Sequence, residues 1–421
     1  MLEYLNRYKN YYILTEGISN FGGAQLLVLR RAKFLKSKGF NVKIIVSRHR
    51  GEFILEKEFQ GFPILYIPEL DQPLFKYSNK RISNILNSIS IFLYNHNDSI
   101  IETNSLQSSV WGELVAKKNK YKHIIYLFSE LKIKNYLLYP GLNYFLFKYK
   151  RGELFGCSRK SLEIIFGKYY DASQNNFINV SFDSEEIKEK TIPSVENYEL
   201  LENSKTILTV SRLEKEYVEY LIEDVIKIAK KNPQININLI VGGGTIFNEI
   251  KNKFDNNYLP PKLNLPNLRI IFTGYIKVLG VDLFRLTDVF VGMGTASLNS
   301  ISQKCATLVV NPFTNKTPGI LGIHTTTFGY PDNNIEYNLD ELIESLLFDY
   351  KLLDEAKNNG YELYESSYKT DSCFNKFDDL VSKSNQSIEY YNYNIILMRR
   401  FSDFIIYLLK ISRRKLKTII K

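Results

Sequence analysis

Two cations follow a short apolar strand in the second half of the sequence. The stretch TVSRLEKE places Arg212 and Lys215 on a turn between a predicted strand and a helical segment. A guanidinium binds phosphate oxygens as a fork and an ammonium binds them as a point charge, so this pair suits a diphosphate. Basic residues are also common on exposed turns, so a purely structural interpretation stays open at this point.

A second candidate anion site lies in the stretch DVFVGMGTASLNS. Gly294, Thr295 and Ser297 fall between a buried strand and a helix, where free backbone N–H groups, two hydroxyls and the helix dipole converge. A glycine-rich crossover with Ser or Thr as the helix N-cap would give the same letters. The pattern therefore predicts an anion site or an ordinary capped helix.

Three further strand ends carry glycine. Gly22 and Gly23 precede a helix, Gly243 lies in LIVGGG, and Gly274 precedes Tyr275 in FTGY. Glycine lets the backbone approach a ligand closely, and Tyr275 could lie against a nucleobase. Any one of these loops is equally a tight turn. Their recurrence after successive strands favours a shared binding purpose.

The elements that must position these loops alternate between strands and helices. This alternation predicts a parallel sheet of the α/β class. A first series of strands is expected at 11–15, 41–47, 99–102, 122–128 and 153–157, and a second series at 206–210, 235–241, 268–273, 288–292 and 306–310.

The two series predict two doubly wound, Rossmann-like domains that face each other across a cleft. The N-terminal domain is expected over 1–185 and the C-terminal domain over 200–383, joined by a polar, acidic connection. Residues 384–421 are expected to form C-terminal helices with a basic amphipathic tail. Open parallel sheets bind ligands outside the carboxyl ends of their strands, so the loops named above should carry the function.

Composition excludes several classes of protein. The 421 residues are 44% hydrophobic and 24% charged, which fits a globular protein and neither a disordered nor a fibrous one. The three cysteines form no CxxC pair, so a disulfide scaffold and a zinc knuckle are not supported. Neither a signal peptide nor a run long enough to span a bilayer is evident. A reducing cytoplasm is therefore expected.

The net charge of +10 is concentrated at the end of the chain. Residues 399–421 hold eight Lys or Arg and one Asp, a local +7, which leaves +3 for the other 398 residues. On a helical wheel the basic residues share one face and aromatic and aliphatic residues lie opposite. This pattern favours an interfacial helix on an anionic membrane surface, with a terminal helix docked on the protein as the alternative. No nucleic-acid recognition motif accompanies the charge, so nucleic acid is not an expected partner.

Taken in order, these segments resemble the GT-B glycosyltransferases of the GT4 type, which build bacterial polysaccharides and glycolipids. The resemblance covers roughly 11–370 and depends on the order and spacing of loose motifs. These are GGAQ, KGFNVKIIVS, ETNSLQSSVWGELVAKK, LFGCSRKSLEII, TVSRLEKE, LIVGGG, IIFTGY and DVFVGMGTASLNS with the following ATLVV.

The resemblance implies a nucleotide-sugar donor held mainly by the C-terminal domain, an acceptor held mainly by the N-terminal domain, and retention of anomeric configuration. It implies no metal and no other cofactor, and the sequence has no Asp-x-Asp after a strand. By resemblance, Arg212 with Lys215 stabilises the leaving diphosphate together with the amides at 294–297. Gly22 and Gly23 form the floor of the cleft, and Glu102 serves the acceptor side.

Two positions depart from the family pattern. The family usually has a Lys five residues after the Arg, where this chain has Tyr217. It usually has a Glu for the donor ribose where this chain has Asn299, which can accept a hydrogen bond but carries no charge. These two departures concern the donor site and motivate a non-catalytic alternative.

The expected function is that of a retaining glycosyltransferase in surface polysaccharide synthesis, such as capsule synthesis. It would act on a lipid-linked saccharide or another glycan from the cytoplasmic face of the cell membrane, as a peripheral protein. A non-catalytic GT-B subunit that partners an active glycosyltransferase is the main alternative. A nucleotide-sugar epimerase of the same fold is a further one. The sequence names neither the donor sugar nor the linkage.

Overall fold

The chain forms two compact units. The computed structural model describes residues 8–18, 23–48, 56–94, 98–128, 142–244, 248–258, 264–276, 278–311, 314, 316–328, 335–384 and 387–391. Unit 1 contains the described residues up to Ser181 together with those from Cys373 onward, and unit 2 spans Phe182–Ser372. Among these residues, none of the helices has the length and apolar character that a membrane crossing requires.

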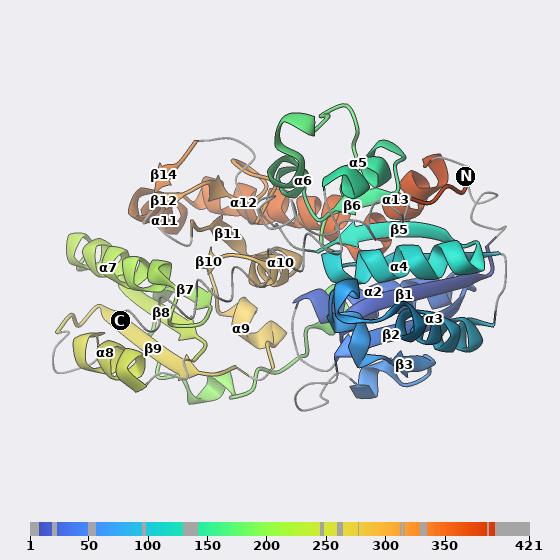
Figure 1. The fold of residues 1–421 in the computed structure, drawn as a ribbon. Helices are drawn as coiled ribbons and strands as arrows, with labels where there is room; N and C mark the ends of the chain where they lie inside the picture. The colour runs from blue at the N-terminus through green and yellow to red at the C-terminus, as the bar shows by residue number, and fades with distance from the viewer. Residues whose placement is uncertain are drawn as a thin grey trace, which may run out of the picture. The chain divides into compact units, whose positions relative to one another are not determined.

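Unit 1 is built on a six-stranded sheet in which every paired strand is parallel (Figure 1). The order β3-β2-β1-β4-β5-β6 reverses direction between β1 and β4. The strands are β1 (Asn10–Gly17), β2 (Asn41–Arg48), β3 (Ile64–Tyr66), β4 (Ser99–Thr103), β5 (Lys122–Leu127) and β6 (Leu154–Gly156).

Helices cover both faces of this sheet because alternate strand residues point to opposite sides. Tyr11 and Ile13 of β1 pack with α2 and α13, whereas Tyr12 and Leu14 pack with α3 and α4. Trp111 of α4 is fully buried in the second of these cores. The helices are α2 (Gly23–Ser37), α3 (Asn79–Leu93), α4 (Leu106–Asn119), α5 (Leu142–Lys150), α6 (Arg159–Phe166) and α13 (Thr370–Lys383).

Unit 2 repeats this plan with a second six-stranded sheet. Its order is β13-β11-β10-β7-β8-β9, in which only β13 runs antiparallel to its neighbour. The direction of winding reverses between β7 and β10. The strands are β7 (Ser204–Val210), β8 (Asn236–Gly242), β9 (Leu268–Gly274), β10 (Val289–Gly292), β11 (Ala306–Val309) and β13 (Gly319–Ile320).

The core of unit 2 lies between its sheet and the flanking helices. Val218, Leu221 and Val225 recur at helical spacing along α7 and are fully buried against β7, β8 and β10. The helices are α7 (Glu216–Lys231), α8 (Asn248–Tyr258), α9 (Val281–Arg285), α10 (Thr295–Ser302), α11 (Leu339–Phe348) and α12 (Tyr350–Leu363), and a two-stranded ladder joins β12 (Lys316–Thr317) to β14 (Tyr337–Asn338).

The two doubly wound sheets confirm the predicted fold class, and each predicted strand overlaps an observed one. The boundaries between the units differ from the expected 1–185 and 200–383. Unit 1 ends at residue 181, and the chain from residue 373 returns to it, so most of α13 belongs to unit 1. Phe374 and Phe377 of α13 lie in the same core as β1 and α2. The amphipathic tail predicted at 399–421 lies outside the described residues.

Candidate functional site

The loops that follow β7 and β10 meet where the strand order of unit 2 reverses. At such a point the two connecting chains leave in opposite directions, which opens a crevice at the carboxyl ends of the strands. β7 ends at Val210 and β10 at Gly292, and the two strands are direct neighbours. The residues that follow them, 211–215 and 293–299, include the two predicted cations and four of the predicted donor-binding residues.

Arg212 and Lys215 lie together on the loop after β7. Arg212 is exposed and Lys215 is half-buried as the N-cap of α7, with its backbone N–H donating to the Arg212 carbonyl at 3.2 Å. Burial lowers the pKa of Lys215, and the neighbouring Arg212 charge lowers it further. Within the described residues, neither cation forms an ion pair with a carboxylate. Two neighbouring, unneutralised cations are an arrangement that an anionic ligand would stabilise.

Backbone hydrogen bonds join this loop to the loops that follow β8 and β9. The amide of Ser211 donates to the carbonyl of Gly242 at 2.8 Å, and the amide of Gly243 donates to that of Gly274 at 2.8 Å. Gly243 has φ +130°, and a Cβ there would stand 1.9 Å from the Ser211 carbonyl oxygen. Only glycine permits this approach, so Gly243 is required for the three loops to stack.

Gly274 and Tyr275 end β9 at the rim of these stacked loops. Gly274 has φ +67° and open space where a side chain would begin. Tyr275 is 75% exposed, and its backbone lies against Gly244. A large aromatic ring held in solvent beside a glycine loop is available for stacking on a planar ligand group.

The start of α10 presents backbone and hydroxyl groups at the same sheet edge. Gly294 is the N-cap with φ +69°, and no side chain caps the first turn. Thr295 is exposed, while Ser297 is fully buried and its hydroxyl makes no hydrogen bond within the described residues. Asn299 is half-buried one turn further on, and its side-chain amide likewise has no partner there. The Gly294 amide donates to the Phe328 carbonyl and the Ser297 amide donates to the Gly294 carbonyl, both at 3.1 Å. Within the described residues, this helix terminus therefore offers an anion the amides of Thr295 and Ala296.

Three buried hydroxyls beneath the loop after β7 were not predicted as a group. Thr209, Ser211 and Tyr217 have buried oxygens, and none makes a hydrogen bond of normal geometry to a described residue. Burial raises the pKa of Tyr217, and the nearby hydroxyls of Ser211 and Thr209 oppose that rise. Tyr217 itself is fully buried in the main core of unit 2. The only sign of this group in the sequence was Tyr217 itself, which stands where the family usually has a Lys. In the structure its aromatic ring is part of the core.

Glu102 lies in unit 1 on β4, away from solvent. Its side chain is fully buried and accepts hydrogen bonds from the Tyr11 hydroxyl at 2.5 Å and the Arg31 Nε at 3.2 Å. Arg31 also forms an ion pair with Asp378 of α13 at 2.9 Å. Burial raises the pKa of Glu102, and the Arg31 charge opposes that rise. This partner set gives Glu102 a role in holding the core together, and its predicted acceptor role stays a prediction.

The loops of unit 1 that carry predicted site residues are only partly described. Gly22 lies outside the described residues, and Gly23 is exposed as the first residue of α2. After β4, Asn104 is buried with a side-chain nitrogen that has no hydrogen-bond partner in the described chain. Among the predicted residues, the structure thus gathers Arg212, Lys215 and the set from unit 2, Gly243, Gly274, Tyr275, Gly294, Thr295, Ser297 and Asn299, at one sheet edge.

A second cluster of unit 1, formed by Thr103, Glu113 and His123, resembles a catalytic triad but is buried without space for a substrate. His123 lies between the Thr103 hydroxyl, 3.0 Å from its Nε2, and the Glu113 carboxylate, 2.6 Å from its Nδ1. A hydroxyl, an imidazole and a carboxylate in line match the partners of a nucleophilic triad. However, a Cβ on Gly112 would stand 2.3 Å from Thr103 and 2.8 Å from His123, so packing leaves no room for a substrate. The cluster is structural.

No described group of three or more His, Cys, Asp or Glu residues has a geometry that could hold a metal ion. The candidate site in unit 2 therefore consists of two cations, glycine loops and a helix terminus.

Comparison with solved structures identifies the fold. A glycosyltransferase from Rickettsia africae matches with a TM-score of 0.65 at 16% identity, over 90% of this chain and 100% of that chain. HepE from Anabaena, in complex with UDP and glucose, matches with a TM-score of 0.61 at 14% identity, over 89% and 100%. The lipopolysaccharide outer core galactosyltransferase WaaB matches with a TM-score of 0.56 at 12% identity, over 89% and 99%. The chain has the GT-B fold.

Neither a protein-family model nor a curated protein matches the sequence. At these identities the structural likeness carries the fold alone, since one fold supports many activities. The function must be argued from the residues at the sheet edge of unit 2.

Proposed function

We propose that the protein is a glycosyltransferase that takes its sugar from a nucleoside diphosphate donor. The observation that carries this proposal is the pair Arg212 and Lys215, two unneutralised cations at the switch point of unit 2, stacked beside glycine loops. An anion of compact, multiple charge fits this arrangement better than a neutral ligand does. Solved structures of the same fold with UDP or a UDP-sugar bound support the choice of ligand.

Each group has a defined role in the proposed reaction. Arg212 and Lys215 hold the diphosphate, and the N-terminus of α10 with Thr295 and Ser297 adds neutral donors. Negative charge on the diphosphate increases as its bond to the sugar breaks, so these fixed donors stabilise the transition state more than the bound donor. Asn299 accepts a hydrogen bond from the ribose, and Tyr275 with Gly243 and Gly274 borders the base.

The finer assignment follows the GT4 type: transfer with retention, without metal, to a lipid-linked saccharide or another glycan in surface polysaccharide synthesis such as capsule synthesis. Gly22 and Gly23 of unit 1 would take part in donor binding, and Glu102 would serve the acceptor. The basic segment 399–421 would hold the enzyme on the inner face of the cell membrane. Vesicle flotation tests this part: loss of 399–421 should abolish binding to phosphatidylglycerol vesicles, and equal binding by both proteins would contradict it.

Donor binding is tested by calorimetric titration of the full chain with UDP and with a panel of UDP-sugars and GDP-sugars. Arg212→Ala should weaken UDP binding by about 10- to 100-fold, because a charge-assisted hydrogen bond contributes about 1.5–3 kcal/mol. Arg269→Ala is a matched control, since Arg269 is an exposed arginine at the opposite, amino end of β9. Equal UDP binding by Arg212→Ala and the wild type would reject the proposed site.

A non-catalytic subunit that partners an active glycosyltransferase is the second candidate. It is favoured by Tyr217, whose ring is buried in the core where a phosphate-binding side chain was expected. In that case the protein should bind UDP weakly, and Asn299→Glu should not strengthen binding. Sugar transfer by the purified protein alone would exclude this candidate.

A further inference from the structure

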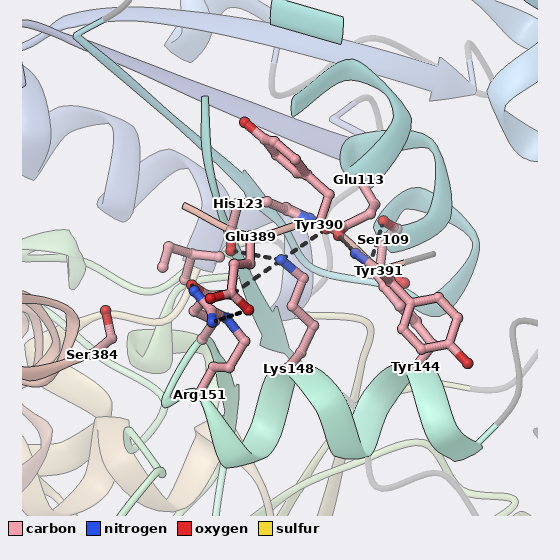
Figure 2. A network of polar contacts seen from close by, with 12 residues as sticks. Ser109, Glu113, His123, Tyr144, Lys148, Arg151, Ser384, Glu389, Tyr390 and Tyr391 are labelled. Carbon is pink, nitrogen blue, oxygen red and sulfur yellow. Dashed lines mark hydrogen bonds and ion pairs between the residues drawn. The ribbon is translucent and has the colours of Figure 1, made fainter. Parts of the chain in front are cut away.

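A short segment near the end of the described chain lies against α4 and α5 of unit 1 (Figure 2). We call residues 387–391, Ser-Ile-Glu-Tyr-Tyr, the strap. The strap comes after α13, which ends at Lys383. It contains no helix or strand, so specific contacts must hold it in place.

Polar contacts join the strap to the rest of unit 1. The backbone N–H of Tyr391 donates to Glu113 Oε1 at 2.8 Å. The Glu389 carboxylate forms an ion pair with Arg151 Nη1 at 3.0 Å, and Arg151 Nη2 donates to the carbonyl of Ser387. Two of these contacts use backbone groups of the strap, and the third uses the Glu389 side chain.

Two tyrosine rings add apolar contact. The Tyr391 ring meets Tyr144 and Phe147 of α5 edge to face, with ring centres 5.4 Å and 5.7 Å apart. The Tyr390 hydroxyl donates to the carbonyl of Tyr121 at 3.1 Å, and burial raises the Tyr390 pKa. Such aromatic pairs contribute about 0.5–1.5 kcal/mol beyond the area that they bury.

The strap closes over a buried ion network. Glu113 Oε2 lies 2.8 Å from Lys148 and 2.6 Å from His123, and Lys148 also meets Glu153 at 3.1 Å. Figure 2 shows the Lys148 side chain pointing from α5 toward Glu113. The charges of Glu113, Glu153, Lys148 and Arg151 cancel inside unit 1. The strap supplies the donor to the second oxygen of Glu113, whose loss would leave a buried carboxylate oxygen without that hydrogen bond.

We propose that this surface of unit 1, lined by Glu113, Tyr121, Tyr144, Phe147 and Arg151, is a docking site for an extended acidic-aromatic peptide, and that the chain's own strap is its occupant. The site combines a buried carboxylate that receives a backbone N–H, a cation that receives an acidic side chain and a carbonyl, and aromatic faces for two tyrosines. The inference does not depend on the proposed transferase activity.

Docking of the strap has a consequence for the rest of the chain. Residues 392–421 follow the strap directly in the sequence. If they bind a surface, the docked strap would tether that surface to the rest of unit 1. Covalent connection also gives the strap a high effective concentration at its site, so a free peptide should not displace it from the wild-type chain.

Hydrogen exchange on the full chain tests the docking. In the wild type, the amides of 387–391 should exchange at least tenfold more slowly than those of an unstructured chain, with the Tyr391 amide among the slowest. The double variant Glu389→Ala with Tyr391→Ala should lose this protection and should speed exchange in α5, while α7 of unit 2 stays unchanged. Tyr350→Ala, at a tyrosine that is 78% exposed in unit 2, is the control and should change neither.

A peptide added in trans separates a docking site from simple packing. The pentapeptide Ser-Ile-Glu-Tyr-Tyr, capped at both ends and present at millimolar concentration, should restore slow exchange to α5 of the double variant and leave the wild type unchanged. A peptide with Ala in place of the final Tyr should fail. The proposal is overturned if strap amides in the wild type exchange like an unstructured chain, or if the folded double variant gains no protection from the peptide. If the double variant does not fold, Glu389→Ala alone takes its place.

Discussion

The buried ion network of unit 1 and the loop edge of unit 2 contain the same kinds of side chain but differ in their partners. In unit 1, Glu113 has Lys148 and His123 beside it, and Arg151 has Glu153 and Glu389. In unit 2, Arg212 and Lys215 lie beside each other with no carboxylate partner within the described residues. Oppositely charged side chains that pair with each other belong to the folded core, whereas two neighbouring cations without a carboxylate partner would be stabilised by binding an anion. Residue type alone does not distinguish the two cases.

The comparison extends to hydroxyl groups. In unit 1 the Thr103 hydroxyl forms a hydrogen bond with His123. The packing around these residues, which resemble a nucleophilic triad in their alignment, leaves no room for a substrate. In unit 2 the buried hydroxyls of Thr209, Ser211, Tyr217 and Ser297 make no hydrogen bond within the described chain. Unit 1 has such atoms as well, including Glu102 Oε1 and Arg31 Nη1, so unpaired buried atoms alone do not distinguish the two units.

Removing one charged side chain from the buried ion network of unit 1 should have the largest effect on the stability of the protein. Lys148→Met leaves Glu113 and Glu153 facing each other without the cation between them, and should lower the free energy of unfolding by about 3–5 kcal/mol. Lys150→Met, at an exposed lysine two residues away, should change it by less than about 0.5 kcal/mol. Urea denaturation measures both. A loss below about 1 kcal/mol for Lys148→Met would show that the network contributes little to stability.

The pH dependence of stability should identify the same network. Burial by itself would raise the pKa of Glu113, but Lys148 and His123 together lower it from 4.5 to about 2, and burial lowers the pKa of His123. Both groups therefore bind more protons when unfolded, so stability should fall as pH drops below about 6.5 for His123 and between 4.5 and 2 for Glu113. The Glu113 shift corresponds to about 3 kcal/mol.

Glu113→Gln is the matched variant for this pH series, measured by urea denaturation. The stability difference between wild type and variant should shrink as pH falls from 4.5 toward 2, because the wild-type carboxylate then loses its charge. A difference that stays constant over that range would mean that Glu113 is not ionised in the folded protein.

Substitutions at the glycines of the stacked loops in unit 2 should have a smaller effect on the free energy of unfolding. Gly243→Ala places a Cβ against the Ser211 carbonyl and should lower the free energy of unfolding by about 2–3 kcal/mol, with loss of stabilisation by UDP. Gly274→Ala meets only the strain of a positive φ, and should lower it by about 1 kcal/mol. Thermal unfolding with and without UDP measures both variants. Equal effects would mean that loop stacking does not depend on the close approach at Gly243.

Local pattern was enough to predict ten of the twelve strands in the two described sheets, the alternation with helices and the glycine loops after strand ends, but it missed the short strands β3 and β13. Strand and helix periodicity can be recognised from neighbouring residues. Open parallel sheets bind ligands at the carboxyl ends of their strands, so the predicted strands also predict where the site lies. For that reason the sequence alone places Arg212, Gly243 and Gly294 at one edge of a sheet. It does not predict the buried hydroxyl group around Tyr217, because burial of a side chain depends on distant elements packed over it.

By itself, the sequence determined two doubly wound units and the identity of the residues at their strand ends, because those features depend on short-range spacing. The tertiary structure decided which charged residues have partners. It brought Asp378 to Arg31 and Glu389 to Arg151, more than 200 residues away in each case, and so assigned most of α13 and the strap to unit 1. Ion pairing and burial require groups to meet in space, and no local pattern states which distant groups will meet.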